Sequence, residues 1–124
     1  MQTRRLILAG LLSGLALPAL AQGRKSGGPP DALTRPIAGA YTARGLNADG
    51  TAYSGTVEIV EQGMAIEMTW QVAGDTIRGQ GIREGRIVTV DWGDKTPVVY
   101  VLMPDGSLHG TWDDGTALEK LTRR

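Results

Sequence analysis

From about residue 38 to the end, the chain alternates between short runs rich in Val, Ile, Thr, Tyr and Trp and pairs of residues that favour turns. The pairs start at positions 49, 62, 74, 84, 93, 105 and 114, so they recur every 9 to 13 residues. Every pair contains a glycine: Asp49-Gly50, Gln62-Gly63, Gly74-Asp75, Glu84-Gly85, Gly93-Asp94, Asp105-Gly106 and Asp114-Gly115. Such spacing predicts short antiparallel strands joined by hairpin turns.

Within the runs, residues alternate with a period of two, which is the pattern of a strand with one buried face. The pattern is clearest between residues 64 and 72, where smaller or polar residues separate Met64, Ile66, Met68, Trp70 and Val72. The predicted strands are 38–46, 51–61, 64–72, 76–83, 86–92, 97–103, 107–113 and 116–122. We therefore expect an all-β domain in which an eight-stranded antiparallel up-and-down meander closes into a small barrel.

Glycine recurs at positions that this pattern places on the inner face of the strands. The positions are Gly55, Gly79, Gly81 and Gly110. Glycine weakens a strand, but it lets a tightly curved sheet bend and leaves room for large neighbours. We expect Trp70, Trp92 and Trp112 to use that room. Two interpretations stay open: the tryptophans fill the core, or one of them lines a ligand cavity at the barrel mouth.

The first part of the chain precedes the predicted barrel. Residues 1–21 have the pattern of a signal peptide, in which two arginines precede an apolar run and an Ala-x-Ala motif ends at Ala21. Cleavage after Ala21 leaves no stable membrane anchor and predicts a periplasmic or secreted protein, exported by the general secretion or the twin-arginine route. Residues 22–37 are rich in Gly and Pro and predict a flexible linker, so that 38–122 is the barrel domain.

The predicted barrel is acidic. Residues 38–122 contain 6 basic and 12 acidic side chains, a net charge of 6 − 12 = −6. Nucleic-acid binding needs a basic face, so this balance argues against a nucleic-acid partner. The chain has no cysteine, so the domain must be stabilised by apolar burial and sheet hydrogen bonds rather than by disulfides.

Few residues are candidates for catalysis or metal binding. His109, the only histidine, falls on the predicted outer face of its strand. Asn47 and Asp49 begin a calcium-loop pattern whose remaining ligands are missing, and Asp-Gly is primarily a turn signal. Glu58 and Glu67, on neighbouring strands, would suit glycoside chemistry only if they faced each other in a cleft. We expect no catalytic, metal or cofactor site.

Several motifs combine turn residues with core residues. They are Gly39-x-Tyr41-x-x-x-Gly45-x-Asn47-x-Asp49-Gly50-Thr51-x-Tyr53-x-Gly55-Thr56-Val57, Val90-x-Trp92-Gly93, Pro97-Val98-Val99-Tyr100 and Gly110-Thr111-Trp112…Glu119-x-Leu121. Over residues 39–122 they resemble a group of short exported bacterial proteins of uncertain role, some of which carry a fibronectin-binding label. More distantly, the meander resembles the calycin architecture of avidins and lipocalins. The avidin biotin contacts and the lipocalin Gly-x-Trp opening are not matched, so the resemblance implies a fold and carries over no ligand residues.

These observations favour an exported, non-enzymatic binding module. Its partner would be a protein or a cell-envelope component, contacted through the outer face of the sixth strand. The alternative is a calycin-like carrier that holds a small hydrophobic ligand in the barrel mouth; an inhibitor of an envelope hydrolase and a carboxylate-based enzyme are further alternatives. The candidate contact residues are Trp70, Trp92, Trp112, Tyr53, Tyr100, Val99, Val101 and Met103.

Overall fold

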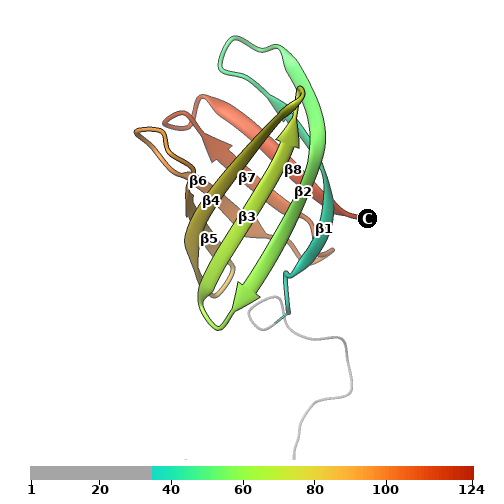
Figure 1. Ribbon diagram of the computed structural model, residues 1–124, viewed down its shortest axis with the longest axis vertical. Helices are drawn as coiled ribbons and strands as arrows, with labels where there is room; N and C mark the ends of the chain where they lie inside the picture. The colour runs from blue at the N-terminus through green and yellow to red at the C-terminus, as the bar shows by residue number, and fades with distance from the viewer. Residues whose placement is uncertain (1–34) are drawn as a thin grey trace, which may run out of the picture. The chain divides into compact units, whose positions relative to one another are not determined.

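The computed structural model describes residues 35–124 and confirms the predicted fold class (Figure 1). The strands pair antiparallel in chain order, and the last strand also pairs with the first, so the sheet closes into a barrel. They are β1 (Gly39–Leu46), β2 (Ala52–Gln62), β3 (Ala65–Val72), β4 (Asp75–Glu84), β5 (Ile87–Asp91), β6 (Val98–Leu102), β7 (Leu108–Trp112) and β8 (Ala117–Arg123). The predicted signal peptide lies outside the described residues, as does the predicted linker up to residue 34.

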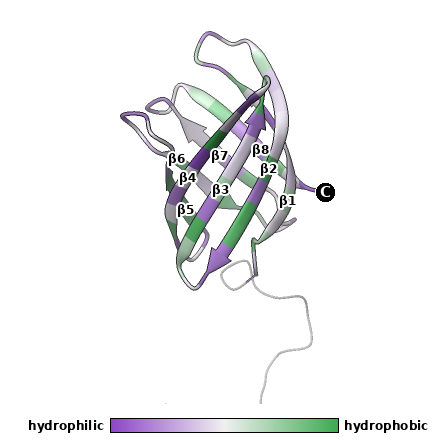
Figure 2. Ribbon diagram, in the orientation of Figure 1, coloured by the Kyte–Doolittle hydropathy of each residue, from purple (hydrophilic) through white to green (hydrophobic). Residues whose placement is uncertain are grey.

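The period of two in the sequence decides which residues face the core. Every strand boundary lies within one residue of its predicted position, and hydrophobic and hydrophilic residues follow one another along β2, β3 and β4 (Figure 2). One prediction was wrong: Met64 is not an inward residue of the third strand. It belongs with Gly63 to the turn after β2 and is 61% exposed. This tight turn needs a positive φ, which Gly63 supplies at 59°, so the strand begins only at Ala65.

Of the four predicted inward glycines, Gly79 and Gly110 make room for aromatic rings. A Cβ on Gly55 or Gly81 would instead collide with a backbone carbonyl oxygen of the neighbouring strand. Gly79 follows the expectation, because a Cβ at that position would lie 3.0 Å from the Trp70 ring. Gly110 does not, since it lies opposite Tyr100 across β6 and β7. A Cβ on Gly110 would lie 2.5 Å from the Tyr100 ring, closer than side chains pack. Part of the expected space for tryptophan is therefore space for tyrosine.

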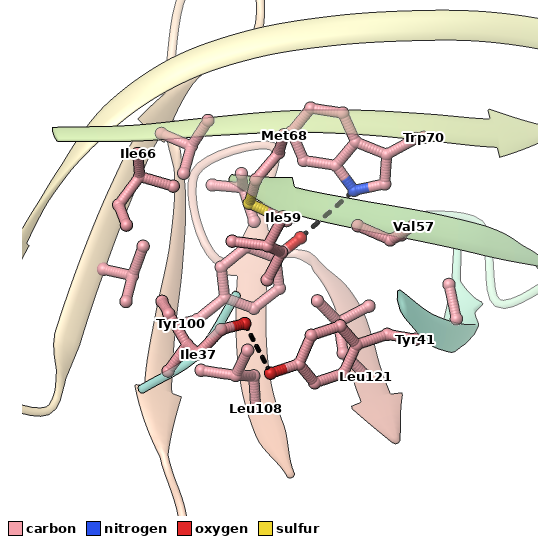
Figure 3. Packing of buried hydrophobic residues seen from close by; sticks show 14 of the residues in the cluster. Ile37, Tyr41, Val57, Ile59, Ile66, Met68, Trp70, Tyr100, Leu108 and Leu121 are labelled. Atoms are coloured by element: carbon pink, nitrogen blue, oxygen red, sulfur yellow. Dashed lines mark hydrogen bonds between the residues drawn. The ribbon is translucent and has the colours of Figure 1, made fainter. Parts of the chain in front are cut away.

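One end of the barrel, which carries the turns after β2, β4 and β6, is filled; we call it the closed end. Ile37, which precedes β1 and falls at the end of the predicted linker, is fully buried there. The hydroxyl of Tyr41 donates to the Ile37 carbonyl at 2.8 Å (Figure 3). Other fully buried residues in this half are Ile59, Ile66, Leu102, Leu108 and Leu121. Together these side chains fill the closed end and form an apolar core.

A paired carboxylate completes the closed end. Glu61 accepts a hydrogen bond from the Ile37 N–H at 2.9 Å on Oε1, and Arg83 donates to its Oε2 at 2.9 Å. Arg123 donates to two backbone carbonyls just before β1, and its guanidinium lies 5.1 Å from the centre of the Tyr41 ring.

Within residues 35–124, no helix has the length and hydropathy that crossing a membrane requires.

Candidate ligand-binding site

The opposite end of the barrel, which we call the mouth, is hollow. It carries the loops after β1, β3, β5 and β7, and its walls enclose a cavity of about 250 Å³. That volume equals roughly eight molecules of liquid water at ~30 Å³ each, so the cavity suits a small ligand. Its walls include five of the six aromatic residues of the chain: Tyr53, Trp70, Trp92, Tyr100 and Trp112.

A buried carboxylate lies in the inner wall of this cavity. Glu119 of β8 lines the cavity and is 7% exposed. Its Oε1 accepts a hydrogen bond from the Tyr53 hydroxyl at 2.7 Å, and its Oε2 accepts one from the Tyr100 hydroxyl at 2.5 Å and one from the Trp70 indole N–H at 3.1 Å. The Trp70 N–H also points to the Tyr100 hydroxyl, at 3.2 Å (Figure 3). A carboxylate offers about four acceptor positions, so one position on Oε1 is left.

The other polar hydrogens of the aromatic wall also have acceptors. The Trp112 indole N–H donates to the Tyr53 hydroxyl oxygen at 3.1 Å. The Trp92 indole N–H donates to the carbonyl of Thr96, in the loop after β5, at 3.1 Å. Each of the five aromatic side chains therefore already donates its one polar hydrogen. A ligand that enters the cavity meets ring surfaces and acceptor atoms on this wall, not free donors.

The aromatic rings are arranged edge to face. The Trp92 and Trp112 ring centres are 5.5 Å apart, with an angle of 85° between the ring planes. Tyr53 and Trp112 are 6.3 Å apart at 67°. This is the favoured geometry for aromatic pairs, so the rings hold one another in place. All three side chains are half-buried, which leaves part of each ring accessible from the mouth.

The two tyrosines of the mouth are held in their protonated form. Burial raises the pKa of Tyr53 and of Tyr100 above the ordinary value of 10.0, and the neighbouring Glu119 carboxylate raises the pKa of both further. The physical reason is that a phenolate would lose water contacts and would be repelled by the carboxylate. Both phenols consequently act as hydrogen-bond donors. A tyrosine nucleophile would need the opposite shift, to a lower pKa.

Strand register brings the network together as one row across four strand pairs. Glu119 of β8 lies beside Gly45 of β1 and Gly110 of β7. These glycines are in turn the cross-strand partners of Tyr53 on β2 and Tyr100 on β6. A Cβ on either glycine would collide with the neighbouring tyrosine ring. Because both glycines lack side chains, the two rings extend over them and reach the carboxylate from opposite sides.

The structure brings together five of the eight predicted contact residues. Those in the cavity are Tyr53, Trp70, Trp92, Tyr100 and Trp112. The other three lie half-buried on the outer side of the barrel, on β6 and just after it: Val99, Val101 and Met103. The predicted set thus falls into two separate groups, an inner aromatic group and an outer aliphatic group.

Sequence reasoning missed Glu119 as a site residue. Its signal was the period of two in β8, where it falls between the buried residues Ala117 and Leu121. An acidic residue in register with two core residues predicts a buried carboxylate. The apolar Leu118, which lies on the outer face and is exposed, made this register harder to recognise.

Of the remaining candidates, Asn47 lines the cavity and the others do not. His109, Glu58 and Glu67 are exposed on the outer faces of β7, β2 and β3. The Asp49 carboxylate accepts hydrogen bonds from the N–H and the hydroxyl of Thr51, at 2.9 and 2.7 Å, as in a side-chain-capped turn. In the described part of the chain, no three His, Cys, Asp or Glu side chains come together in a way that could hold a metal ion.

Comparisons of this chain with protein-family models, with curated protein sequences and with solved structures found no match. The resemblance to short exported bacterial proteins stays a prediction from the motifs. The function therefore has to be inferred from the geometry of the barrel.

Proposed function

We propose that the barrel is a non-enzymatic binding module that holds a small molecule in its mouth. The observation that carries the proposal is the hollow, aromatic-walled cavity around Glu119, opposite an end that is filled by core side chains. Apolar walls with a few convergent polar groups are typical of ligand pockets. The phenols of the cavity are held protonated and the one histidine lies on the outer wall, which supports binding rather than catalysis.

We also propose a place of action. The signal-peptide pattern of residues 1–21 supports a mature protein that works in the periplasm or outside the cell. A ligand carrier in either compartment meets small molecules directly.

Intrinsic fluorescence tests the proposal directly, because all three tryptophans of the chain line the cavity. Titration with small neutral compounds (indole, 2-phenylethanol and cyclohexanol) is expected to shift or quench the emission in a saturable way for at least one of them. If the cavity holds only water and admits none of the compounds, the emission will stay unchanged throughout every titration. That result would contradict a ligand-binding mouth.

A matched pair of variants locates the binding. Ile77 lines the cavity and Ile82 is exposed on the outer face of the same strand, β4. Ile77→Phe places a larger side chain in the cavity and narrows it. We expect binding to weaken at least about tenfold, because even one extra methylene in a hydrophobic pocket has an effect of about that size. Ile82→Phe adds the same bulk outside the barrel and should leave the affinity unchanged. Equal effects of the two variants would place the binding elsewhere.

A partner protein or envelope component is a second candidate, favoured by the outer wall of β4, β5 and β6. Ile82 and Ile87 are 54% and 40% exposed there, and Ile87 pairs across the strands with Val101. Half-buried Val99 and Met103 extend this apolar surface. We propose it as the contact surface for such a partner. A double variant, Ile87→Ser with Val101→Ser, should lose retention on immobilised fibronectin or envelope extract; unchanged retention would exclude this surface.

A further inference from the structure

The two ends of the barrel carry opposite charge. The loops and strand ends of the mouth contain six acidic side chains and one basic side chain, a net charge of 1 − 6 = −5. These residues are Asp49, Asp75, Asp91, Asp94, Lys95, Asp113 and Asp114. By the same count of loops and strand ends, the closed end holds four basic and two acidic side chains, a net charge of 4 − 2 = +2: Arg35, Arg86, Arg123, Arg124, Glu84 and Asp105. An acidic rim raises the local concentration of cations and repels anions before they reach the cavity.

Inside the cavity, the Glu119 carboxylate is held only by neutral donors. Buried carboxylates are normally balanced by a cation, since moving a charge out of water is costly. Among residues 35–124, no basic side chain lies within ion-pair distance of Glu119. The hydroxyls of Tyr53 and Tyr100 and the indole N–H of Trp70 supply hydrogen bonds but no charge. A positively charged ligand group would supply the balancing charge.

The aromatic wall of the cavity selects for the same chemistry. Every indole N–H and phenol O–H of the wall already has an acceptor, so an anionic ligand would find no donor among them. A ligand has to bring its own donor to the remaining acceptor position on Glu119 Oε1. The half-buried rings of Tyr53, Trp92 and Trp112 provide π surfaces, which attract cations.

We propose that the mouth binds a small organic ammonium ion. Its nitrogen donates to Glu119 Oε1, and its apolar body packs against the rings of Trp92 and Trp112. The inference rests on the proposed function and adds the chemical class of the ligand. The cavity volume of about 250 Å³ limits the body to the size of a single aromatic ring with a short side chain.

Three probes with the same carbon skeleton test the charge preference. At pH 7, 2-phenylethylamine is a cation, 2-phenylethanol is neutral and phenylacetate is an anion. In fluorescence titrations of the mature protein, the amine is expected to bind about tenfold more tightly than the alcohol, the effect of one charge-assisted hydrogen bond. Phenylacetate should bind least, and added salt should weaken the amine most.

The substitution Glu119→Gln keeps the shape of the side chain and removes its charge. It is expected to lower the affinity for 2-phenylethylamine about tenfold and to leave that for 2-phenylethanol nearly unchanged. Glu67→Gln is the matched control, because Glu67 is exposed on the outer face of β3. It should change neither affinity. Denaturation curves of both variants establish that each is folded.

The outcomes separate this inference from the proposed function. Equal binding of the three probes, tighter binding of phenylacetate, or an unchanged amine affinity in Glu119→Gln would overturn the ammonium class while the cavity remains a binding site. If a neutral compound of the panel binds and the amine does not, the ammonium class is likewise overturned and the cavity remains a binding site. Absence of binding for every compound, neutral and charged, overturns the proposed function and this inference with it.

Discussion

Glu61 and Glu119 are two largely buried carboxylates at opposite ends of one small barrel, and their partners differ. At the closed end, Glu61 pairs with Arg83 at 2.9 Å beside a filled apolar core. At the mouth, Glu119 accepts hydrogen bonds from Tyr53, Tyr100 and Trp70 and faces a cavity. The contrast separates two uses of the same residue type. A carboxylate with its own cation belongs to the fold, and one with neutral donors and an open position is suited to a ligand.

The surroundings of the two carboxylates follow the same division. At the closed end, Ile37 precedes β1 and is fully buried against the core, so that its side chain covers this end. The mouth has half-buried aromatic rings in place of such a plug. Natural proteins depart from ideal packing mostly at functional sites, where an unfilled volume is retained. The barrel therefore has one end that is filled and carries an ion pair, and a hollow end that we propose as the binding end.

Breaking the ion pair at the closed end should cost the barrel the most stability. Arg83→Met removes the cation from Glu61, whose carboxylate then keeps only the Ile37 N–H. Breaking a buried ion pair costs ~3–5 kcal/mol; since the Glu61 side chain is 16% exposed, we expect a loss of about 2–4 kcal/mol. Urea denaturation measures it. Arg78→Met, on the outer face of the same strand, is the control and should change stability little.

A pair of Tyr→Phe substitutions compares the hydrogen bonds of the two ends. Tyr100 donates to a carboxylate in the mouth, and Tyr41 donates to a neutral backbone carbonyl at the closed end. Hydrogen bonds to charged groups are stronger, so Tyr100→Phe should lower the free energy of unfolding by about 2 kcal/mol and Tyr41→Phe by about 1 kcal/mol. Both side chains are fully buried, which makes the comparison fair. A larger loss for Tyr41→Phe would show that the carboxylate network is not formed.

Alkaline titration tests the burial of the tyrosines at both ends. The pKa of Tyr41, Tyr53 and Tyr100 is raised, in each case chiefly by burial. Unfolded chains lose phenolic protons near the ordinary value of 10.0, and the folded protein does so only at higher pH. Stability is therefore full below pH 10 and falls as the pH rises above it. Ultraviolet absorbance should show no tyrosinate at pH 10 while the protein is folded; half-complete ionisation there would contradict the buried network.

The smallest effects are expected in two similar turns, one at each end. Asp49 caps the N–H and hydroxyl of Thr51 at the mouth, and Asp105 caps those of Ser107 at the closed end. These hydrogen bonds, that of the side-chain hydroxyl first, lower the pKa of both carboxyls. The stabilisation is present above the ordinary pKa and is lost as the pH falls through the lowered values. Carbon-13 chemical shifts of the carboxyls measure both titrations; an ordinary pKa at either residue would mean that its cap is open.

The sequence predicts most of this fold because the signals are local. A period of two, interrupted by turn pairs with glycine, determines strand positions to within one residue. Met64 was misplaced because the turn residues continue the alternation of β3. Ile37 fell within the predicted linker because a single apolar residue after a Gly- and Pro-rich stretch carries no periodicity. Only the closure of the barrel reveals that it covers the core.

The site was predictable in part. The aromatic residues of the site were predicted correctly, because large rings on the inward faces of a small barrel must lie either in its core or in its mouth. The Tyr53–Gly45–Glu119–Gly110–Tyr100 row was not, because it crosses five strands and depends on the register between β8 and β1. That register is a property of the closed sheet and not of any one segment. Long-range pairing therefore determines which buried carboxylate lines the cavity.

The most direct test measures stability and amine affinity side by side in two variants, Glu119→Gln and Arg83→Met, by urea denaturation and by calorimetric titration with 2-phenylethylamine. Glu119→Gln weakens the hydrogen bonds that the carboxylate accepts but also removes a buried charge. We therefore expect it to lose no more than about 1–2 kcal/mol of unfolding free energy and to bind the amine about tenfold more weakly. Arg83→Met is expected to lose stability and to keep the affinity of the wild-type protein. A Glu119→Gln variant that is destabilised as much as Arg83→Met, yet binds the amine like the wild-type protein, would contradict the division between a structural and a ligand-binding carboxylate.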